Sequence, residues 1–205
     1  MIALLDYGAG NTGSVLRAVQ YLGYEACIVD RPEQLAAASK IIFPGQGHFA
    51  AMMQALEDRG LIEQLRNVLR GEKPFLGICL GLQALYEGSD EAPAHPGLGL
   101  LAGRVRRLEG VFKVPHVGWS QLEIGRENSA PEGRLLRGIP SGSFVYYCHS
   151  YFAPQTQESV AVTDYGQRFA AAVETGESRR LWAVQFHPEK SGEVGLRVLK
   201  NFLEL

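Results

Sequence analysis

The chain has 205 residues, of which 46% are hydrophobic and 20% charged, and its formal net charge is −2 at pH 7. This composition can fill a core, shows no signature of disorder and argues against nucleic acid as the main partner. The 3 cysteines are odd in number and widely spaced, which favours free thiols in a reducing compartment over disulfides or a metal site. No apolar run reaches membrane-spanning length and the N-terminus lacks the basic residues of a signal peptide, so we expect a cytoplasmic protein without membrane contact.

The first half of the chain alternates short apolar runs with amphipathic segments. The apolar runs predict strands at Ile2–Asp6, Glu25–Val29, Lys40–Phe43 and Phe75–Ile78. The amphipathic segments predict helices at Asn11–Leu22, Leu35–Ala38, Phe49–Leu56, Leu61–Leu69 and Leu82–Tyr86. Strands separated by helices indicate right-handed crossovers, and therefore an α/β fold with a mainly parallel central sheet flanked by helices.

The second half has a different character, with strand patterns at hairpin-scale spacing. These strands are predicted at Gly103–Leu108, Ser143–Phe152, Ser159–Thr163, Phe169–Thr175 and Leu181–Phe186. They indicate an antiparallel β extension of the sheet, closed by a helix over Ser191–Leu205. Glu123–Gly138 is the most loop-like region, and no repeat or linker divides the chain. We therefore expect a single domain over residues 1–205.

Gly77-Ile78-Cys79-Leu80-Gly81 places one cysteine where a strand runs into a helix. Glycine on both sides permits a sharp bend, since a Cβ there would clash. The turn brings the thiol of Cys79 near a helix N-terminus, whose free N–H groups favour a thiolate. The pattern predicts a nucleophile elbow with sulfur in place of oxygen. The alternative is a buried structural cysteine, which is the commoner role of a lone Cys.

Gln185-Phe186-His187-Pro188-Glu189 closes an apolar strand and supplies the other half of the catalytic hypothesis. A cysteine nucleophile needs a base, and the base needs a carboxylate that holds its imidazole in one tautomer. If the strand continues, its two-residue period points His187 and Glu189 the same way. By itself this segment could equally be a solvent-exposed turn; paired with the elbow, it predicts the triad Cys79, His187 and Glu189.

Phe43-Pro44-Gly45-Gln46-Gly47 is a second strand that enters a glycine-rich loop before a helix. Without side chains at the glycines, a backbone N–H can approach a reacting carbonyl, and an oxyanion needs about two such donors. We expect one donor from Leu80, after the nucleophile, and the other from Gly47. A phosphate-binding loop is the rival interpretation, but no Lys-Ser/Thr follows.

These motifs together resemble the class I, triad-type glutamine amidotransferases. Further segments, in this order, resemble the glutaminase subunit of imidazole glycerol phosphate synthase within that family: Asp6–Asn11, Pro44–Phe49, Pro115–Trp119, His149–Tyr151 and His187–Ser191. The resemblance runs from end to end and implies the flavodoxin-like fold of class I glutamine amidotransferases. One departure is Ser120, where the family usually has Asn after Trp119.

The resemblance implies that the chain hydrolyses L-glutamine to glutamate and ammonia without a cofactor, as part of histidine biosynthesis. It implies that ammonia passes to a (β/α)8-barrel cyclase subunit in a heterodimer. The cyclase then makes imidazole glycerol phosphate and an aminoimidazole carboxamide ribonucleotide. By the family pattern, the two ends of the substrate bind to Gln83 and Glu91, helped by backbone near Ser150 and Tyr151. Solvated surface positions are the alternative for Gln83 and Glu91.

The docking face for this partner is expected at the glycine-rich turn with Asn11 and Ser14, at the Trp119 loop, and at Tyr146 and Lys190. Tyr and Trp are common interface anchors, although each is more often a core residue. Lys190 directly follows the proposed triad carboxylate, so we expect it to pair with an acidic residue of the cyclase.

Other hypotheses fit parts of the same pattern. Another triad glutaminase, such as one that serves pyridoxal phosphate, GMP or anthranilate synthesis, is disfavoured by Asp6–Asn11 and Pro115–Trp119. A catalytically inactive docking subunit is disfavoured by the intact Cys79, His187 and Glu189. A γ-glutamyl peptidase could share the elbow and act alone on peptides.

Overall fold

An eight-stranded sheet runs through the molecule in the order β2-β1-β3-β4-β13-β12-β11-β8. The computed structural model describes residues 1–205 except 72, 111, 126–132 and 177–179. Parallel pairing joins the strands of one half: β1 (Ile2–Leu5), β2 (Ala26–Val29), β3 (Lys40–Gly45), β4 (Phe75–Cys79) and β13 (Leu181–Val184). Antiparallel pairing adds the others: β12 (Arg168–Glu174), β11 (Ser159–Asp164) and β8 (Glu123–Ile124). The predicted parallel sheet with an antiparallel extension is confirmed.

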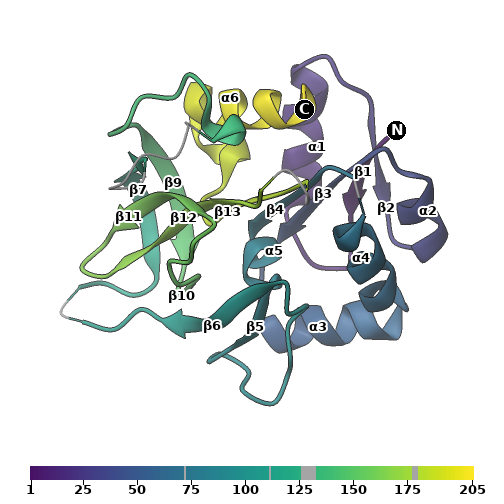
Figure 1. Cartoon of the computed structure of the whole chain (residues 1–205), viewed down its shortest axis with the longest axis horizontal. Helices are drawn as coiled ribbons and strands as arrows, with labels where there is room; N and C mark the ends of the chain where they lie inside the picture. The colour runs from purple at the N-terminus through teal and green to yellow at the C-terminus, as the bar shows by residue number, and fades with distance from the viewer. Residues whose placement is uncertain (72, 111, 126–132, 177–179) are drawn as a thin grey trace.

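Helices cover both faces of the parallel half (Figure 1). One face packs against α1 (Thr12–Tyr21) and α6 (Gly192–Leu203). The other packs against α2 (Pro32–Ala37), α3 (Phe49–Asp58) and α4 (Leu61–Arg70). Because both faces are covered, β1, β4 and β13 are buried along their whole length and read as continuous apolar runs. No helix in the described ranges is long and apolar enough to cross a membrane.

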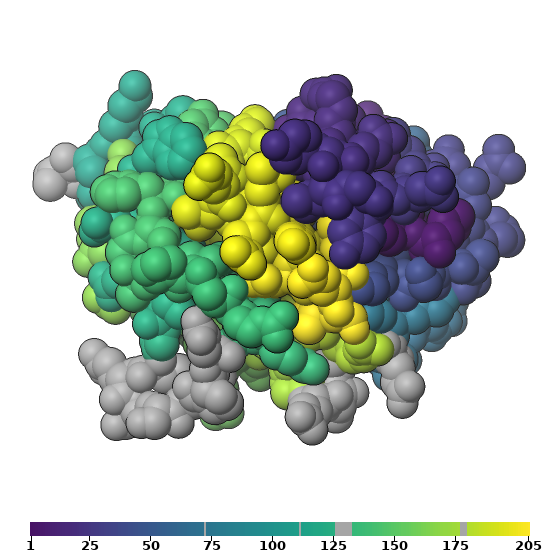
Figure 2. Space-filling model, turned by 90° about the horizontal axis from the view of Figure 1, so that it is seen from above, coloured from purple at the N-terminus to yellow at the C-terminus, as the bar shows by residue number. Residues whose placement is uncertain are grey.

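The C-terminal helix α6 lies between the N-terminal segment and the strands of the second half, as its yellow surface between purple and green shows (Figure 2). Two small sheets flank the main one. The first has β6 (Leu101–Arg107) between β10 (Tyr151–Phe152) and β5 (Tyr86–Ser89), and the second pairs β7 (His116–Gln121) with β9 (Phe144–His149). Single turns complete the chain: α5 (Leu80–Gln83), η1 (Arg134–Leu136) and η2 (Pro188–Lys190).

The predicted helix over Leu82–Tyr86 is confirmed only at Leu82 and Gln83 and is wrong beyond them. Helix α5 ends at Gln83, and Tyr86 begins β5. The carbonyl of Ala84 accepts the N–H of Leu98 at 2.8 Å, and the carbonyl of Leu85 accepts the N–H of Leu100 at 2.8 Å. Long-range hydrogen bonds therefore take the acceptors that further helical turns would have used.

The second half also departs from the sequence-based strands. The single strand predicted over Ser143–Phe152 is wrong, because β9 pairs with β7 while β10 pairs with β6. The chain changes sheets at Ser150, whose carbonyl accepts the N–H of Leu108 at 2.9 Å. The predicted Trp119 loop is likewise wrong, since Trp119 lies within β7 opposite Tyr146. Of the loop-like region Glu123–Gly138, residues 126–132 lie outside the described residues, and the rest includes β8 and η1.

Candidate active site

Cys79 sits at a strained turn at the end of β4. Its φ of 53° and ψ of −107° make it the one non-glycine residue with positive φ in the described part of the chain. A Cβ on Gly81 would overlap the carbonyl oxygen of Phe43, and one on Gly77 would lie 2.8 Å from the carbonyl oxygen of Gly81. Glycine is therefore required on both sides of the bend, as the sequence predicted. Since α5 is a single turn, its dipole contributes little to holding a thiolate.

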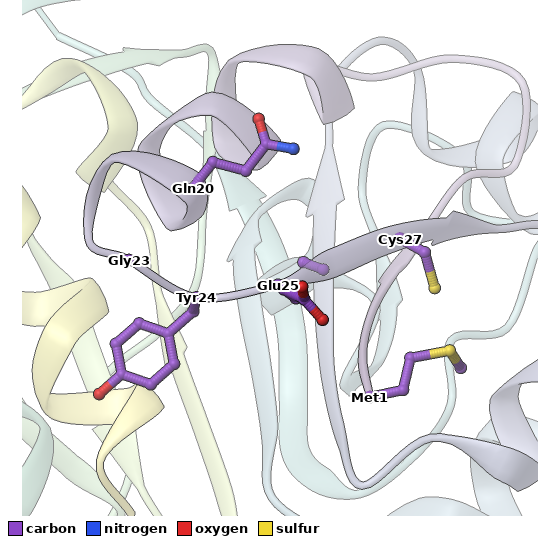
Figure 3. Close-up of a pocket in the computed structure, with 7 residues that line it drawn as sticks. Met1, Gln20, Gly23, Tyr24, Glu25 and Cys27 are labelled. Carbon is purple, nitrogen blue, oxygen red and sulfur yellow. The ribbon is translucent and has the colours of Figure 1, made fainter.

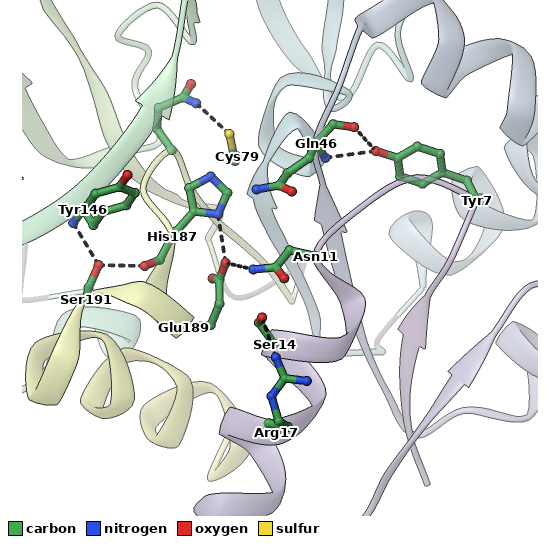
Figure 4. Close-up of polar contacts among 11 residues, drawn as sticks. Tyr7, Asn11, Ser14, Arg17, Gln46, Cys79, Tyr146, His187, Glu189 and Ser191 are labelled. Carbon is green, nitrogen blue, oxygen red and sulfur yellow. Dashed lines mark hydrogen bonds and ion pairs between the residues drawn. The ribbon is translucent and has the colours of Figure 1, made fainter. Parts of the chain in front are cut away.

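His187 reaches the same edge of the sheet from β13, which pairs in parallel with β4. Its Nδ1 lies 2.9 Å from Oε1 of Glu189, and both side chains are at most 2% exposed. Figure 4 shows the imidazole between the thiol of Cys79 and the carboxylate of Glu189. The expected continuation of the strand is wrong, because Pro188–Lys190 forms a 3₁₀ turn. That turn still brings the carboxylate back onto the imidazole.

The ionisable groups of this cluster shift one another's pKa values. Burial lowers the pKa of His187, but the charge of the neighbouring Cys79 sulfur and the hydrogen bond and charge of Glu189 outweigh burial and raise this pKa to about 10. Burial raises the pKa of Glu189, but the hydrogen bond and positive charge of His187 outweigh it and hold this pKa below its ordinary value. The imidazolium of His187 beside the carboxylate of Glu189 is therefore the favoured state of this pair at neutral pH.

Asn11 completes the carboxylate's surroundings, although the sequence suggested it only for the docking face. Its Nδ2 donates to Oε1 of Glu189 at 2.9 Å (Figure 4). The same oxygen faces His187, whereas Oε2 of Glu189 is buried without a partner among the described residues. Ser14, one turn along α1, accepts a hydrogen bond from Nη2 of Arg17 at 2.9 Å. Ser14 also borders a groove between α1 and α6 that reaches Glu189.

A cavity of about 420 Å³ opens beside Cys79. Its size suits a small molecule. It brings together the predicted oxyanion donors and all of the predicted substrate contacts. The lining residues are Gln46, Gly47, Cys79, Leu80, Gln83, Glu91, Pro115, Cys148, His149, Ser150 and Tyr151.

Two side chains in this cavity are already anchored to backbone. Gln83 donates from Nε2 to the carbonyl of Tyr151 at 2.7 Å and to Oε1 of Gln185 at 3.3 Å. Oε2 of Glu91 accepts the N–H of Phe49 at 2.8 Å. These contacts fix where the amide of Gln83 and the carboxylate of Glu91 lie, so neither is a freely solvated surface group.

The glycine-rich loop after β3 is held by Tyr7, which sequence reasoning missed. The hydroxyl of Tyr7 donates to the carbonyl of Gln46 at 2.8 Å and accepts the N–H of Gln46 at 3.0 Å (Figure 4). Burial raises the pKa of Tyr7 to about 12, so the hydroxyl stays neutral and able to donate. Gly47 follows with φ of 102°, and a Cβ added there would meet no heavy atom within 4 Å. Tyr7 belongs to the Asp6–Asn11 turn, but nothing in the neighbouring sequence signals its contact with Gln46.

The remaining predicted interface residues form one group at the surface, with Trp119 and Lys190 exposed and Tyr146 half-buried. Trp119 is 54% exposed and packs edge-on against Tyr146, with ring centroids 6.0 Å apart. The Nζ of Lys190 lies 5.9 Å from the centre of the Tyr146 ring. The carbonyl of Tyr146 accepts the N–H of His187 at 2.9 Å. This group is therefore joined to His187 by that backbone hydrogen bond and by Ser191, whose hydroxyl accepts the N–H of Tyr146 and donates to the carbonyl of His187.

A second hollow of about 580 Å³ lies at the other end of the sheet (Figure 3). It is bordered by Met1, Tyr24, Glu25 and Cys27. Residues Ile2 and Ala26 pair there, whereas Gly45 and Cys79 pair at the opposite edge. The thiol of Cys27 contacts the carbonyl of Ile2, and no histidine lines this hollow, so it lacks the groups for nucleophilic catalysis. Among the described residues, no three His, Cys, Asp or Glu side chains are grouped as metal ligands would be.

The structure thus brings the Cys79 sulfur, the His187 imidazole and the Glu189 carboxylate together beside a cavity of small-molecule size. Thiolates attack carbonyl carbon, and the adjacent imidazolium can protonate a leaving amine. This arrangement on a parallel α/β sheet is typical of cysteine-dependent hydrolases, a class that includes enzymes acting on amides.

Comparison with known proteins places the chain more closely. The family model described as "Glutamine amidotransferase class-I" matches residues 3–205. The imidazole glycerol phosphate synthase subunit HisH of Moorella thermoacetica is 46% identical over 100% of this chain and 94% of its own length. The same subunit of Bacillus cereus is 44% identical over 98% and 93%. A solved glutamine amidotransferase superposes with a TM-score of 0.75 at 22% identity, covering 99% of this chain and 97% of its own, which supports the fold.

The chain therefore belongs to the class-I glutamine amidotransferase family and, within it, to the HisH subunits of imidazole glycerol phosphate synthase. The resemblance noted in the sequence is confirmed.

Proposed function

We propose that Cys79, His187 and Glu189 carry out the glutaminase reaction of this family. The observation that carries the proposal is the buried His187 imidazole, 2.9 Å from the Glu189 carboxylate and facing the strained Cys79 elbow. A structural cysteine would not need the strained backbone, and an exposed turn would not bury an imidazole against a carboxylate.

The reaction follows from the positions of these groups. The Cys79 sulfur attacks the side-chain carbonyl carbon of glutamine, and the carbonyl oxygen becomes an oxyanion. The N–H of Leu80 and an N–H of the Gly47 loop stabilise this oxyanion. His187 gives its proton to the leaving nitrogen, so that the C–N bond breaks and ammonia departs from a γ-glutamyl thioester. The neutral imidazole then takes a proton from water, whose oxygen attacks the thioester and releases glutamate and the thiolate.

Recognition of the substrate ends is assigned to the anchored side chains. Since both hydrogen bonds of Gln83 leave from its Nε2, its amide oxygen can accept a donor from the α-amino group. Glu91 uses Oε2 for the N–H of Phe49, which leaves Oε1 for the same ammonium. The carbonyl of Tyr151 already accepts from Gln83 and from His149, so we assign the α-carboxylate to N–H groups of the Ser150–Tyr151 backbone.

The ammonia is passed to a partner subunit in this proposal. The relatives are named as subunits of a synthase, which supports a partner for this chain too. We propose that the partner is a (β/α)8-barrel cyclase, that the heterodimer acts in the cytoplasm in histidine biosynthesis, and that residues 1–205 act as one domain. Docking is assigned to the group of Trp119, Tyr146 and Lys190 together with Asn11 and Ser14, all close to the triad.

A glutaminase assay on the full chain, with and without the cyclase and its nucleotide, tests the proposal. We expect Cys79→Ala to lose about 10³-fold or more in kcat, since the nucleophile is removed. Cys27→Ala, which changes the half-buried thiol at the other end of the sheet, should keep wild-type activity. Retained glutamine hydrolysis in Cys79→Ala would overturn the assignment. Cleavage of γ-glutamyl peptides without any hydrolysis of glutamine would indicate a peptidase.

A further inference from the structure

Gln185, which is not a member of the proposed triad, contacts the sulfur of Cys79. It follows β13 directly, is 0% exposed, and donates its backbone N–H to the carbonyl of Ala171 at 2.9 Å. Its Nε2 lies 3.7 Å from Sγ of Cys79, a hydrogen bond by the distances that sulfur makes. The two residues are 106 positions apart, so no local sequence pattern predicts the contact.

The orientation of the Gln185 amide is fixed by its other partners. Oε1 accepts the backbone N–H of Ala153 at 3.3 Å and Nε2 of Gln83 at 3.3 Å. A backbone N–H can only donate, so the amide oxygen must face Ala153. The NH₂ group is consequently left facing the sulfur, and Gln185 can act toward Cys79 only as a donor.

A donor at this place matters because Cys79 is only 5% exposed. A buried anion loses its water and has to be compensated by hydrogen bonds or by opposite charge. His187 provides the charge beside the sulfur. A neutral thiol gains little from a further donor, whereas a thiolate gains a charge-assisted hydrogen bond.

We propose that Gln185 is a positioning residue that stabilises the Cys79 thiolate and connects it to Gln83. This inference deepens the proposed function and rests on it for the role of Gln83. The connection is direct, because Gln83 donates to the same amide whose NH₂ group faces the sulfur. One buried amide thus links the nucleophile to the side chain assigned to the substrate's α-amino group.

The test is the pH dependence of Cys79 alkylation by iodoacetamide in the full chain, followed by mass spectrometry of the Cys79 peptide. Only the thiolate reacts, so the rate reports its population. In Gln185→Glu and Gln185→Met we expect the pH of the half-maximal rate to move up by about 1 unit, which lowers the rate about tenfold at pH values below the half-maximal point. Gln185→Glu keeps an oxygen for Ala153 and Gln83 but also adds a negative charge beside the sulfur, so Gln185→Met, which removes the donor without adding a charge, measures the donor itself. Gln20→Met, at an exposed amide on α1, is the matched control and should leave the profile unchanged.

An unchanged pH profile in folded Gln185→Met would overturn the inference, whatever its activity. Failure of the proposed function has a different signature, namely a wild-type chain that alkylates at Cys79 but never hydrolyses glutamine with the cyclase present. Should Gln185→Met not fold, Gln185→Leu takes its place, because it also removes the donor without adding a charge.

Discussion

One oxygen of Glu189 makes the polar contacts that orient the imidazole of the proposed triad. Oε1 faces Nδ1 of His187 and also accepts from Nδ2 of Asn11, each at 2.9 Å. A carboxylate held by a second donor cannot rotate away from the imidazole. Asn11 therefore acts on the His187–Glu189 pair from the start of α1, which also borders the proposed docking face.

Asn11→Ala should weaken glutamine hydrolysis even when the partner is absent. The hydrogen bond to a buried charge is worth about 1.5–3 kcal/mol, so kcat should fall about 10-fold or more while KM changes little. The measurement is steady-state glutaminase activity of the chain alone and of the complex.

Ser14→Ala is the control from the same helix, because Ser14 contacts Arg17 and makes no described hydrogen bond to Glu189. If docking is the only role of Asn11, both variants will differ from wild type in the complex alone. That result would remove Asn11 from the triad's support.

At the residue scale, the sequence predicts those site residues whose role is indicated by their immediate neighbours in the chain. Cys79 between glycines and His187 two positions before Glu189 are of this kind, and the structure places them together. Gln185 and Tyr7 are not, because their partners lie 106 and 39 positions away. A glutamine that ends a buried strand has many possible contacts, and only the fold selects the sulfur.

At the scale of elements, the elbow depends on how closely α5 approaches β3. Gly45 of β3 pairs with Cys79, and Gly81 of α5 sits against the carbonyl of Phe43. Both contacts are backbone against backbone, so neither neighbour can move as a flexible side chain would. The element pair therefore tolerates no Cβ at Gly81.

Gly81→Ala should destabilise the protein and displace the proposed nucleophile, Cys79. We expect a loss of about 3 kcal/mol in the free energy of unfolding, since overpacking against backbone costs at least as much as against side chains. Urea denaturation measures this loss, and Cys79 alkylation reports the displaced thiol. Gly176→Ala, with no heavy atom within 4 Å of its Cβ position, should stay within about 0.5 kcal/mol of wild type. Equal stability of the two variants would show that α5 can move away from β3.

The strands and helices that the sequence mispredicts share one cause. Leu82–Tyr86 is a short apolar run, and such runs do not distinguish helix from strand by period alone. The conformation of this run is determined by hydrogen bonds from the N–H groups of Leu98 and Leu100, which lie in a later loop. The strand β7 was missed because Gly118 and Ser120 weaken the alternation of apolar and polar residues along it. Its hydrogen-bonded pairing with β9, and not its own sequence pattern, makes it a strand.

At the scale of the whole molecule, the parallel sheet explains why distant segments meet. The C-terminal ends of β3, β4 and β13 lie at one edge, and they deliver the Gly47 loop, Cys79 and His187. This consequence follows from the alternation of strands and helices, so the sequence could predict it. The changes of sheet around Ser150 could not be predicted, because they depend on which of two small sheets accepts each strand.

The second half of the molecule encloses a directed chain of buried hydrogen bonds. Nδ1 of His149 donates to the carbonyl of Tyr151 at 2.9 Å, so its Nε2 must accept from Nδ1 of His116 at 3.3 Å. Nε2 of His116 then accepts from the hydroxyl of Ser120 at 2.9 Å. Burial lowers the pKa of His116 to about 4 and, with the neighbouring His116, that of His149 to about 3. Both imidazoles are neutral in the folded protein at neutral pH.

Folding stability should therefore fall as the pH drops from about 6.5 toward about 4. In that window the unfolded chain binds protons at His116 and His149 while the folded protein binds none there, so each histidine lowers the free energy of unfolding by up to about 1.4 kcal/mol per pH unit. Urea denaturation at a series of pH values measures the slope. The double variant His116→Gln, His149→Gln should have a shallower slope than wild type, and His95→Gln should not. Parallel slopes for wild type and the double variant would mean that the buried imidazoles take up protons in the folded state, and would contradict the neutral chain.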